Sequence, residues 1–301
     1  MMSTITKNIA KVLSESPIFT TARTLYENNM QDWNYPLTKW QKLWVGFYLI
    51  LSDYSKGRFP PQFDDEQSTF AAEKAYKETL QTLGKSTDQL FLSGIRKPFW
   101  HGSGCEKYLH DYIKIQNALF HQGIRPPARI LEVGCGEGWT AEFLSAAGFH
   151  VLATNITPDS EEFIAHRKNG LAAKGLPHNL EFRISAMEYI REATKDLEPF
   201  DAVYVYEALH HAHDWKKTIQ SFYACLKPGG WCFIFCEPNL IHTLVSYRVA
   251  RLSNTHEIGI SPAKLKQCLR SAGFTNINTL HNRVHFYMRT NWFAAQKADN
   301  F

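Results

Sequence analysis

The stretch Ile130–Gly148, ILEVGCGEGWTAEFLSAAG, decides the fold, because a short apolar run passes through three close glycines into a helical pattern. Gly134, Gly136 and Gly138 are spaced G-x-G-x-G, whereas dinucleotide folds use G-x-G-x-x-G. Trp139 stands where a dinucleotide-binding helix keeps a small residue, and no Lys-Ser or Lys-Thr pair follows to hold a triphosphate. The loop therefore argues against both kinds of phosphate ligand.

The chain on both sides of this loop alternates between short apolar runs and helical patterns. Five predicted strands alternate with four predicted helices, which indicates a doubly wound parallel α/β sheet. After these elements we expect an irregular lid insertion at about 239–260, then a helix at 261–273 and two more strands at 275–282 and 291–297. The first five strands are predicted at 128–134, 150–156, 180–185, 200–208 and 231–238.

The first 95 residues differ in composition and hydrophobic pattern: they are rich in aromatic side chains and have long helical patterns without the alternation typical of strands. We expect residues 1–95 to form a mainly helical extension that covers the substrate, and residues 96–301 to form the main domain. The longest apolar run, Leu43–Leu51, is too short to cross a bilayer of about 30 Å. The sequence therefore predicts a buried helix there.

Composition excludes several classes of protein. The chain has 33 lysines and arginines against 29 aspartates and glutamates. No block of basic residues is long enough to bind along a phosphate backbone, so we expect no nucleic-acid partner. The N-terminal sequence lacks the apolar core of a secretory signal, which favours the cytoplasm. The six cysteines form no pair of C-x-x-C elements, so we expect reduced, buried thiols and no metal site.

Glu132 indicates what the glycine loop holds. It lies two residues before Gly134, where a carboxylate would repel a phosphate but attract a cation. The segment LEVGCGEG resembles motif I of class I S-adenosylmethionine-dependent methyltransferases, and the resemblance covers about residues 100–297. It implies S-adenosylmethionine as cofactor and a Rossmann-like, seven-stranded, mostly parallel sheet with an antiparallel last strand.

The resemblance also implies where the cofactor binds. In this family the acid matching Glu132 helps to hold the methionine amino group, and the backbone of the glycine loop approaches the ligand closely. The second strand of the family usually ends in an acid that accepts from both ribose hydroxyls, but this chain has Asn155, whose carbonyl can accept one such bond. The expected cofactor-binding residues are Glu132, Gly134, Cys135, Gly136, Asn155, Ile156, Ser185, Ala186 and Met187.

The segment YVYEALHHAHDW, residues 204–215, corresponds to the family's path from the methyl donor to the substrate. We predict that His211 is catalytic, as a base for a hydroxyl acceptor, with Glu207 orienting it or acting as a second candidate. His210 and His213 fit structural roles, and adjacency alone does not support a metal site. Oxygen is therefore favoured over nitrogen or carbon as the methyl acceptor.

The segments on either side of the predicted cofactor site contain the candidate substrate residues, which are Trp100, Ser103, Tyr108 and His256. Together they favour a small organic substrate. A lipid or membrane-surface substrate is the alternative, suggested by the tryptophan-rich segment 38–54. A non-catalytic protein that keeps the fold is a further alternative, suggested by Asn155, and a nicotinamide oxidoreductase is a remote one.

Overall fold

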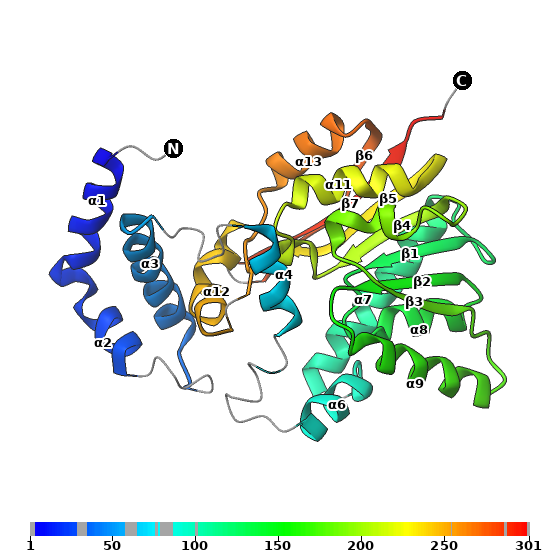
Figure 1. Ribbon diagram of the computed structural model, residues 1–301, viewed down its shortest axis with the longest axis horizontal. Helices are drawn as coiled ribbons and strands as arrows, with labels where there is room; N and C mark the ends of the chain where they lie inside the picture. The colour runs from blue at the N-terminus through cyan, green and yellow to red at the C-terminus, as the bar shows by residue number, and fades with distance from the viewer. Residues whose placement is uncertain are drawn as a thin grey trace.

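The computed structural model describes residues 4–28, 35–57, 65–75, 78, 87–99, 102–253, 255–285 and 288–299. Figure 1 shows a twisted sheet with helices on both faces, and a lobe of N-terminal helices beside it. The described part of the chain thus contains an α/β layer structure and a helical extension.

The sheet has seven strands in the order β3-β2-β1-β4-β5-β7-β6. Strands β1 to β5 pair in parallel, and β7 runs antiparallel to both β5 and β6. The predicted doubly wound, mostly parallel sheet with an antiparallel last strand is therefore confirmed. The strands are β1 Arg129–Val133, β2 His150–Asn155, β3 Leu180–Ile184, β4 Phe200–Tyr206, β5 Leu226–Pro238, β6 Phe274–His285 and β7 Met288–Lys297.

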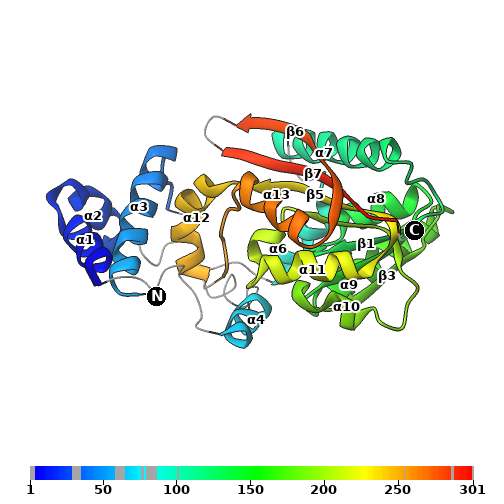
Figure 2. The ribbon, with the colours of Figure 1, turned by 90° about the horizontal axis from the view of Figure 1, so that it is seen from above.

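Successive residues of each strand face opposite layers, which produces two cores. Ile130 of β1 belongs to the core beneath helices α7 (Gly102–His121), α8 (Trp139–Ala146) and α9 (Ser160–Ala173). The next residue, Leu131, belongs to the core on the other face of the sheet. That core lies beneath α10 (Ile190–Ala193), α11 (Trp215–Cys225) and α13 (Pro262–Ser271), and Figure 2 shows the two helical layers from above. Short 3₁₀ turns, η2 at Met187–Tyr189 and η3 at Leu209–His211, follow β3 and β4.

The N-terminal lobe consists of helices joined around an aromatic core of its own. Helix α3 begins at a capping box, in which the Thr38 hydroxyl accepts from the Gln41 N–H and the Gln41 side chain accepts from the Thr38 N–H. The described helices that precede α7 are α1 Thr4–Glu15, η1 Pro17–Phe19, α2 Thr20–Asn28, α3 Lys39–Ser55, α4 Glu66–Lys74 and α6 Thr87–Arg96, of which α4 and α6 lie outside this core.

The segment expected to be irregular at 239–260 contains a helix, α12 Leu240–Ser253, so that prediction was wrong. Tyr247 of α12 is buried in one cluster with Val45 and Leu49 of α3, and its hydroxyl donates to Asp53. Arg251 also pairs with Asp53. Because α3 supplies these partners, the helix depends on tertiary packing that the local pattern does not reveal.

The predicted buried helix at Leu43–Leu51 forms part of α3, but only one side of it is buried. Val45, Gly46 and Leu49 are covered, whereas Trp40 is largely exposed. No helix within the described residues is both long enough and apolar enough to span a membrane. All six cysteines are free; four are buried as predicted, whereas Cys105 and Cys268 are only partly buried.

Helices α3 and α12 approach most closely at Gly46, which gives a test of this contact. A Cβ on Gly46 would lie 1.7 Å from the backbone oxygen of Leu244, so Gly46→Ala forces the helices apart. We expect a loss of about 1–3 kcal/mol in the free energy of unfolding, measured by urea denaturation. Gly170→Ala in α9 is the control, because its Cβ meets nothing within 4 Å. Equal stability of Gly46→Ala and the wild type would contradict the close packing.

Candidate functional site

A cavity of about 450 Å³ lies at the carboxyl ends of β1, β2 and β4. The strand order reverses between β1 and β4, and open α/β sheets bind ligands at such a switch point. The volume lies within the usual range for a small-molecule or cofactor pocket, roughly 300–1,000 Å³. The predicted site residues that line it are Gly134, Gly136, Asn155, Ile156, Ala186, Met187, Glu207 and His211.

The glycine loop presents bare backbone to this cavity. Gly134, Gly136 and Gly138 all have positive φ angles, of 70°, 53° and 70°. A Cβ on Gly134 would lie 2.7 Å from the Ala208 side chain and 2.8 Å from the Met187 Cε, whereas a Cβ on Gly136 would meet nothing within 4 Å. The loop therefore closes against its neighbours at Gly134 and stays open at Gly136.

Glu132 lies behind the loop and does not line the cavity. The Thr140 hydroxyl donates to Glu132 Oε1, while Oε2 has no hydrogen-bond partner among the described residues. Burial raises the pKa of Glu132 to about 7, against the lowering effect of the Thr140 hydrogen bond. An orphaned, buried carboxylate oxygen here suits a cationic group or a water that reaches it through the loop.

The bulk of Trp139 does not block the N-terminus of α8, contrary to the expectation from the sequence. Its side chain is buried under the loop, with ring centroids 5.4 Å from Tyr108, 5.9 Å from Phe143 and 5.6 Å from Tyr206. Trp139 is thus a core residue, and the helix N-terminus beside it is not filled by the indole.

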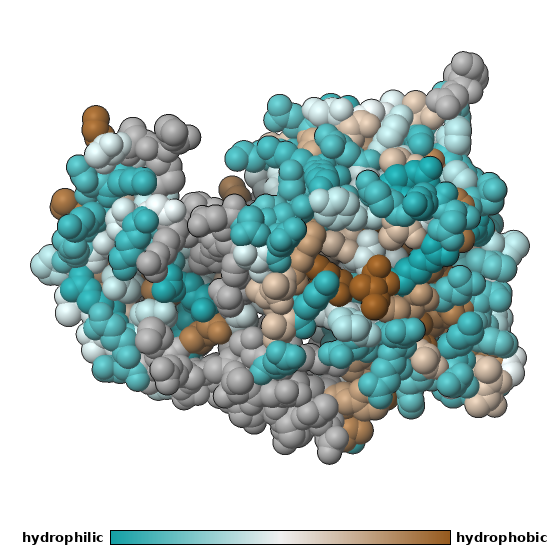
Figure 3. All heavy atoms as spheres, viewed as in Figure 1, coloured by the Kyte–Doolittle hydropathy of each residue, from teal (hydrophilic) through white to brown (hydrophobic). Residues whose placement is uncertain are grey.

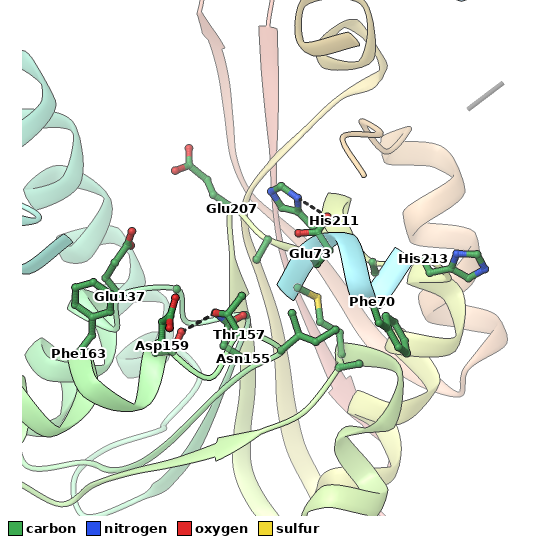
Figure 4. A pocket seen from close by; sticks show the side chains of 18 of the residues that line it. Phe70, Glu73, Glu137, Asn155, Thr157, Asp159, Phe163, Glu207, His211 and His213 are labelled. Atoms are coloured by element: carbon green, nitrogen blue, oxygen red, sulfur yellow. Dashed lines mark hydrogen bonds and ion pairs between the residues drawn. The ribbon is translucent and has the colours of Figure 1, made fainter. Parts of the chain in front are cut away.

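Asn155 ends β2 with its side chain held in one orientation. Its Nδ2 donates to the hydroxyls of Thr157 and Ser160, each at 2.7 Å. The carbonyl Oδ1 is therefore the atom of this side chain that could accept from a ligand hydroxyl. Figure 4 shows Asn155 and Thr157 together at the ends of the strands, with Asp159 and Phe163 beside them.

The remaining predicted cofactor residues divide into two groups. Ile156, Ala186 and Met187 line the cavity. The Ser185 hydroxyl instead donates to the Ala186 carbonyl oxygen at 2.8 Å, and neither Ser185 nor the buried Cys135 is part of the cavity wall. After β3, the cavity wall is therefore formed by Ala186 and Met187 together with Glu188.

His211 reaches the cavity from η3 and lies between two carboxylates. Its Nδ1 is 3.6 Å from Glu73 Oε1, and its Nε2 is 3.8 Å from Glu257 Oε1. Figure 4 shows His211 and Glu73 facing each other. Burial by itself lowers the pKa of His211, but Glu257 and Glu73 outweigh it and raise the pKa to about 10. In this arrangement His211 is an imidazolium at neutral pH.

Glu207 occupies a strained position at the end of β4. Its φ is 48°, and Cys236 opposite it has φ 57°, conformations that non-glycine residues rarely adopt. Glu207 Oε1 is 2.7 Å from Lys107 Nζ and accepts from the Cys236 thiol at 3.3 Å. The ion pair fixes the carboxylate at the edge of the cavity.

Of the predicted substrate residues, the two whose side chains the structure describes lie away from the cavity wall. Trp100 lies outside the described residues, and Ser103 lies in α7 with its side chain outside them. Tyr108 packs on Trp139. His256 is buried with its Nδ1 3.2 Å from the His210 carbonyl oxygen, and burial lowers its pKa to about 4. Neither Tyr108 nor His256 lines the cavity.

Several cavity residues were missed by the sequence analysis. Thr157 and Phe163 follow the end of β2, and their place after a strand at the carboxyl edge is a signal that could have revealed them. Asp159, which from the sequence is a possible substitute for the usual ribose-binding acid, also lines the cavity. Phe70 and Glu73 come from α4, which reaches the cavity only through the fold. No local pattern in the sequence marks these two residues.

Comparison with known proteins agrees with this geometry. A family model described as a methyltransferase domain matches residues 106–279. The ubiquinone biosynthesis O-methyltransferase of Xylella fastidiosa strain M23 is 31% identical over 194 residues, covering 58% of this chain and 72% of that protein. The mitochondrial ubiquinone biosynthesis O-methyltransferase of Bos taurus is 27% identical over 241 residues, covering 71% of this chain and 63% of that protein.

Solved structures share the fold at low sequence identity. A Haemonchus contortus phosphoethanolamine N-methyltransferase 2, in complex with S-adenosylhomocysteine, has a TM-score of 0.53 at 16% identity, covering 74% of this chain and 61% of that one. The [4+2]-cyclase SpnF has a TM-score of 0.53 at 15% identity, covering 80% and 98%. Because the second protein is named as a cyclase, this likeness shows the fold and not the reaction.

The close approach at Gly134 predicts how the cavity responds to a substitution. Gly134→Ala would press a Cβ against Ala208 and Met187, so we expect at least about tenfold weaker binding of S-adenosylhomocysteine, equivalent to about 1.4 kcal/mol. Isothermal titration calorimetry measures this. Gly175→Ala is the control, because Gly175 has a similar φ of 67° but open space around it, away from the cavity. Unchanged affinity in Gly134→Ala would refute the site.

Proposed function

We propose, from the premise that the chain belongs to the methyltransferase-domain family and is a class I S-adenosylmethionine-dependent methyltransferase, that it methylates a hydroxyl oxygen of a small aromatic molecule. The observation that carries the proposal is one cavity, in which the glycine loop and Asn155 lie on one side and His211 on the other. The relatives named as ubiquinone biosynthesis O-methyltransferases support oxygen as the acceptor.

The residues of the cavity fit S-adenosylmethionine. Gly134 and Gly136 offer backbone that a ligand can approach, and Asn155 Oδ1 would accept from a ribose hydroxyl. Ala186 and Met187 would pack on the adenine, because apolar and thioether groups suit an aromatic face. When bound, the cofactor supplies a methyl group on a sulfonium sulfur, which leaves as a neutral thioether.

His211 would act at the acceptor oxygen. Because Glu73 and Glu257 keep the imidazole charged, we place it as a hydrogen-bond donor to the acceptor oxyanion, whose hydroxyl proton has passed to solvent. This differs from the free base expected from the sequence. The acceptor oxygen held in this way would be placed to receive the methyl group that the bound cofactor supplies. Glu207, held by Lys107, would orient the acceptor.

The proposed role of His211 predicts separate effects on binding and on chemistry. We expect His211→Ala to lower kcat by about 100-fold or more on a panel of phenols and catechols, because a positioned donor or acid–base group contributes about 10²–10⁴-fold. Its affinity for S-adenosylhomocysteine should stay within about twofold of the wild type. His178→Ala, at an exposed loop, is the control. If His211→Ala turns over every acceptor at the wild-type rate, then orientation alone drives the transfer.

A substrate presented at a lipid surface is a second candidate, favoured by a specific observation on α1. Ile5, Ile9 and Val12 follow helical spacing and are 72%, 55% and 69% exposed, on the side of α1 away from the buried Ala10. Figure 3 shows hydrophobic residues protruding from this lobe. Amphipathic helices with an outward apolar stripe and nearby lysines bind membrane interfaces.

Vesicle binding tests this candidate. We expect the wild type to co-sediment with vesicles that contain phosphatidylglycerol, and Ile9→Glu to weaken the partition about tenfold, because a charge replaces a side chain of the stripe. Asn169→Glu, on the exposed side of α9, makes a similar charge change away from the lobe. Equal sedimentation of Ile9→Glu and the wild type, or no sedimentation of either, would exclude the lipid surface.

A further inference from the structure

A cluster of metal-binding side chains lies next to the cofactor cavity. His210 belongs to η3, His242 to α12, and Glu257 to the segment after α12. One ligand atom from each lies within 4.8 Å of the others. Glu257 Oε2 is 2.8 Å from His242 Nε2 and 3.7 Å from His210 Nε2. The loop after β4 and the region of α12 thus bring their donor atoms to one point.

Glu237 holds His210 in the orientation that a metal ligand needs. The Nδ1 of His210 lies 2.9 Å from Glu237 Oε2, so Nδ1–H donates to the carboxylate and Nε2 faces Glu257. The carboxylate also accepts from the backbone N–H groups of Ala208 and Leu209, at 2.7 and 2.8 Å. Metal-bound histidines typically donate their second ring nitrogen to such a carboxylate. Glu237 therefore already makes the hydrogen bond that a metal-bound His210 would need.

We infer that His210, His242 and Glu257 bind a divalent transition-metal ion of the zinc class, set behind His211 at the wall of the cofactor cavity. Two imidazoles and one carboxylate form a ligand set that zinc sites use, with a fourth position left for water. Magnesium and calcium prefer oxygen ligands, so they fit this set less well. His210 is buried, and His242 and Glu257 are mostly buried, which limits competition from solvent.

The same side chains could also serve as a hydrogen-bonded network without a metal. Glu257 contacts three histidines, because its Oε1 is 3.8 Å from His211 Nε2 in addition to the contacts with His210 and His242. In the sequence, the adjacency of His210, His211 and His213 does not by itself support a metal site. The fold adds new evidence, because it brings His242 and Glu257, from a different segment, next to His210. The two interpretations differ in one measurable property, because only the metal site would bind a divalent ion.

A bound ion would be a positioning site and not a catalytic one. It would join α12 and the segment that follows it to the loop after β4, which carries His211. His210, His242 and Glu257 do not line the cavity themselves, whereas His211 does. The ion would therefore act on the reaction from behind His211, without contacting the substrate, and its positive charge would oppose the protonated state of His211 that Glu257 favours in the metal-free arrangement.

Metal titration of the full chain tests the inference. After treatment with a chelator, Zn²⁺ is titrated by calorimetry and Co²⁺ by its visible absorption, which reports tetrahedral coordination. We expect one ion per chain, a raised Tm, and at least about tenfold weaker binding in His242→Ala and Glu257→Gln. His178→Ala, outside the cluster, should bind Zn²⁺ like the wild type.

Binding of S-adenosylhomocysteine to each variant separates a lost metal site from a lost fold. The inference is supported if His242→Ala keeps this affinity while Zn²⁺ binding falls and the Co²⁺ spectrum disappears. It is overturned if the wild-type protein binds neither Zn²⁺ nor Co²⁺ at concentrations up to about 100 μM. Equal Zn²⁺ affinity in His242→Ala, or a preference for Mg²⁺ over Zn²⁺, overturns it as well.

Discussion

The buried carboxylate of Glu237 is the interaction on which the site depends. It is fully buried at the end of β5 and accepts backbone N–H groups of Ala208, Leu209 and His210, together with the His210 ring. A buried charge is costly unless hydrogen bonds satisfy it, so the loop after β4 has one favourable position. Burial alone would raise the pKa of Glu237, but its contact with the His210 ring and its hydrogen bonds from the loop N–H groups lower it.

This position defines both walls of the cavity. The loop presses Ala208 toward Gly134, where no Cβ fits, and it directs His211 toward the opening. The glycine loop and the reacting side are therefore coupled through β5, and a shift of one would open a gap against the other. The class of reaction follows from the cofactor side, whereas the acceptor depends on the side of the cavity that α4 and His211 form.

The sheet was predicted well from the sequence because the patterns that mark its strands are local in the chain. Period-two runs and the glycine loop mark β1 to β5, and the carboxyl ends of parallel strands meet at one edge, which brings Asn155, Met187 and His211 together. Helix α12 was missed because its partner, α3, lies about two hundred residues away in the chain. Glu237 was missed for the same reason. The histidine partners of Glu237 and Glu257, which are His210 and His242, are likewise brought to them only by the fold.

A crystal structure of the complex with S-adenosylhomocysteine would test the central claim most directly, since the claim is that the glycine loop and Asn155 hold the methyl donor. The account predicts the ligand in the cavity, with the backbone of Gly136 in contact, a ribose hydroxyl on Asn155 Oδ1, and the thioether sulfur turned toward His211. A ligand bound elsewhere, or one in this cavity that contacts neither Gly136 nor Asn155, would contradict it.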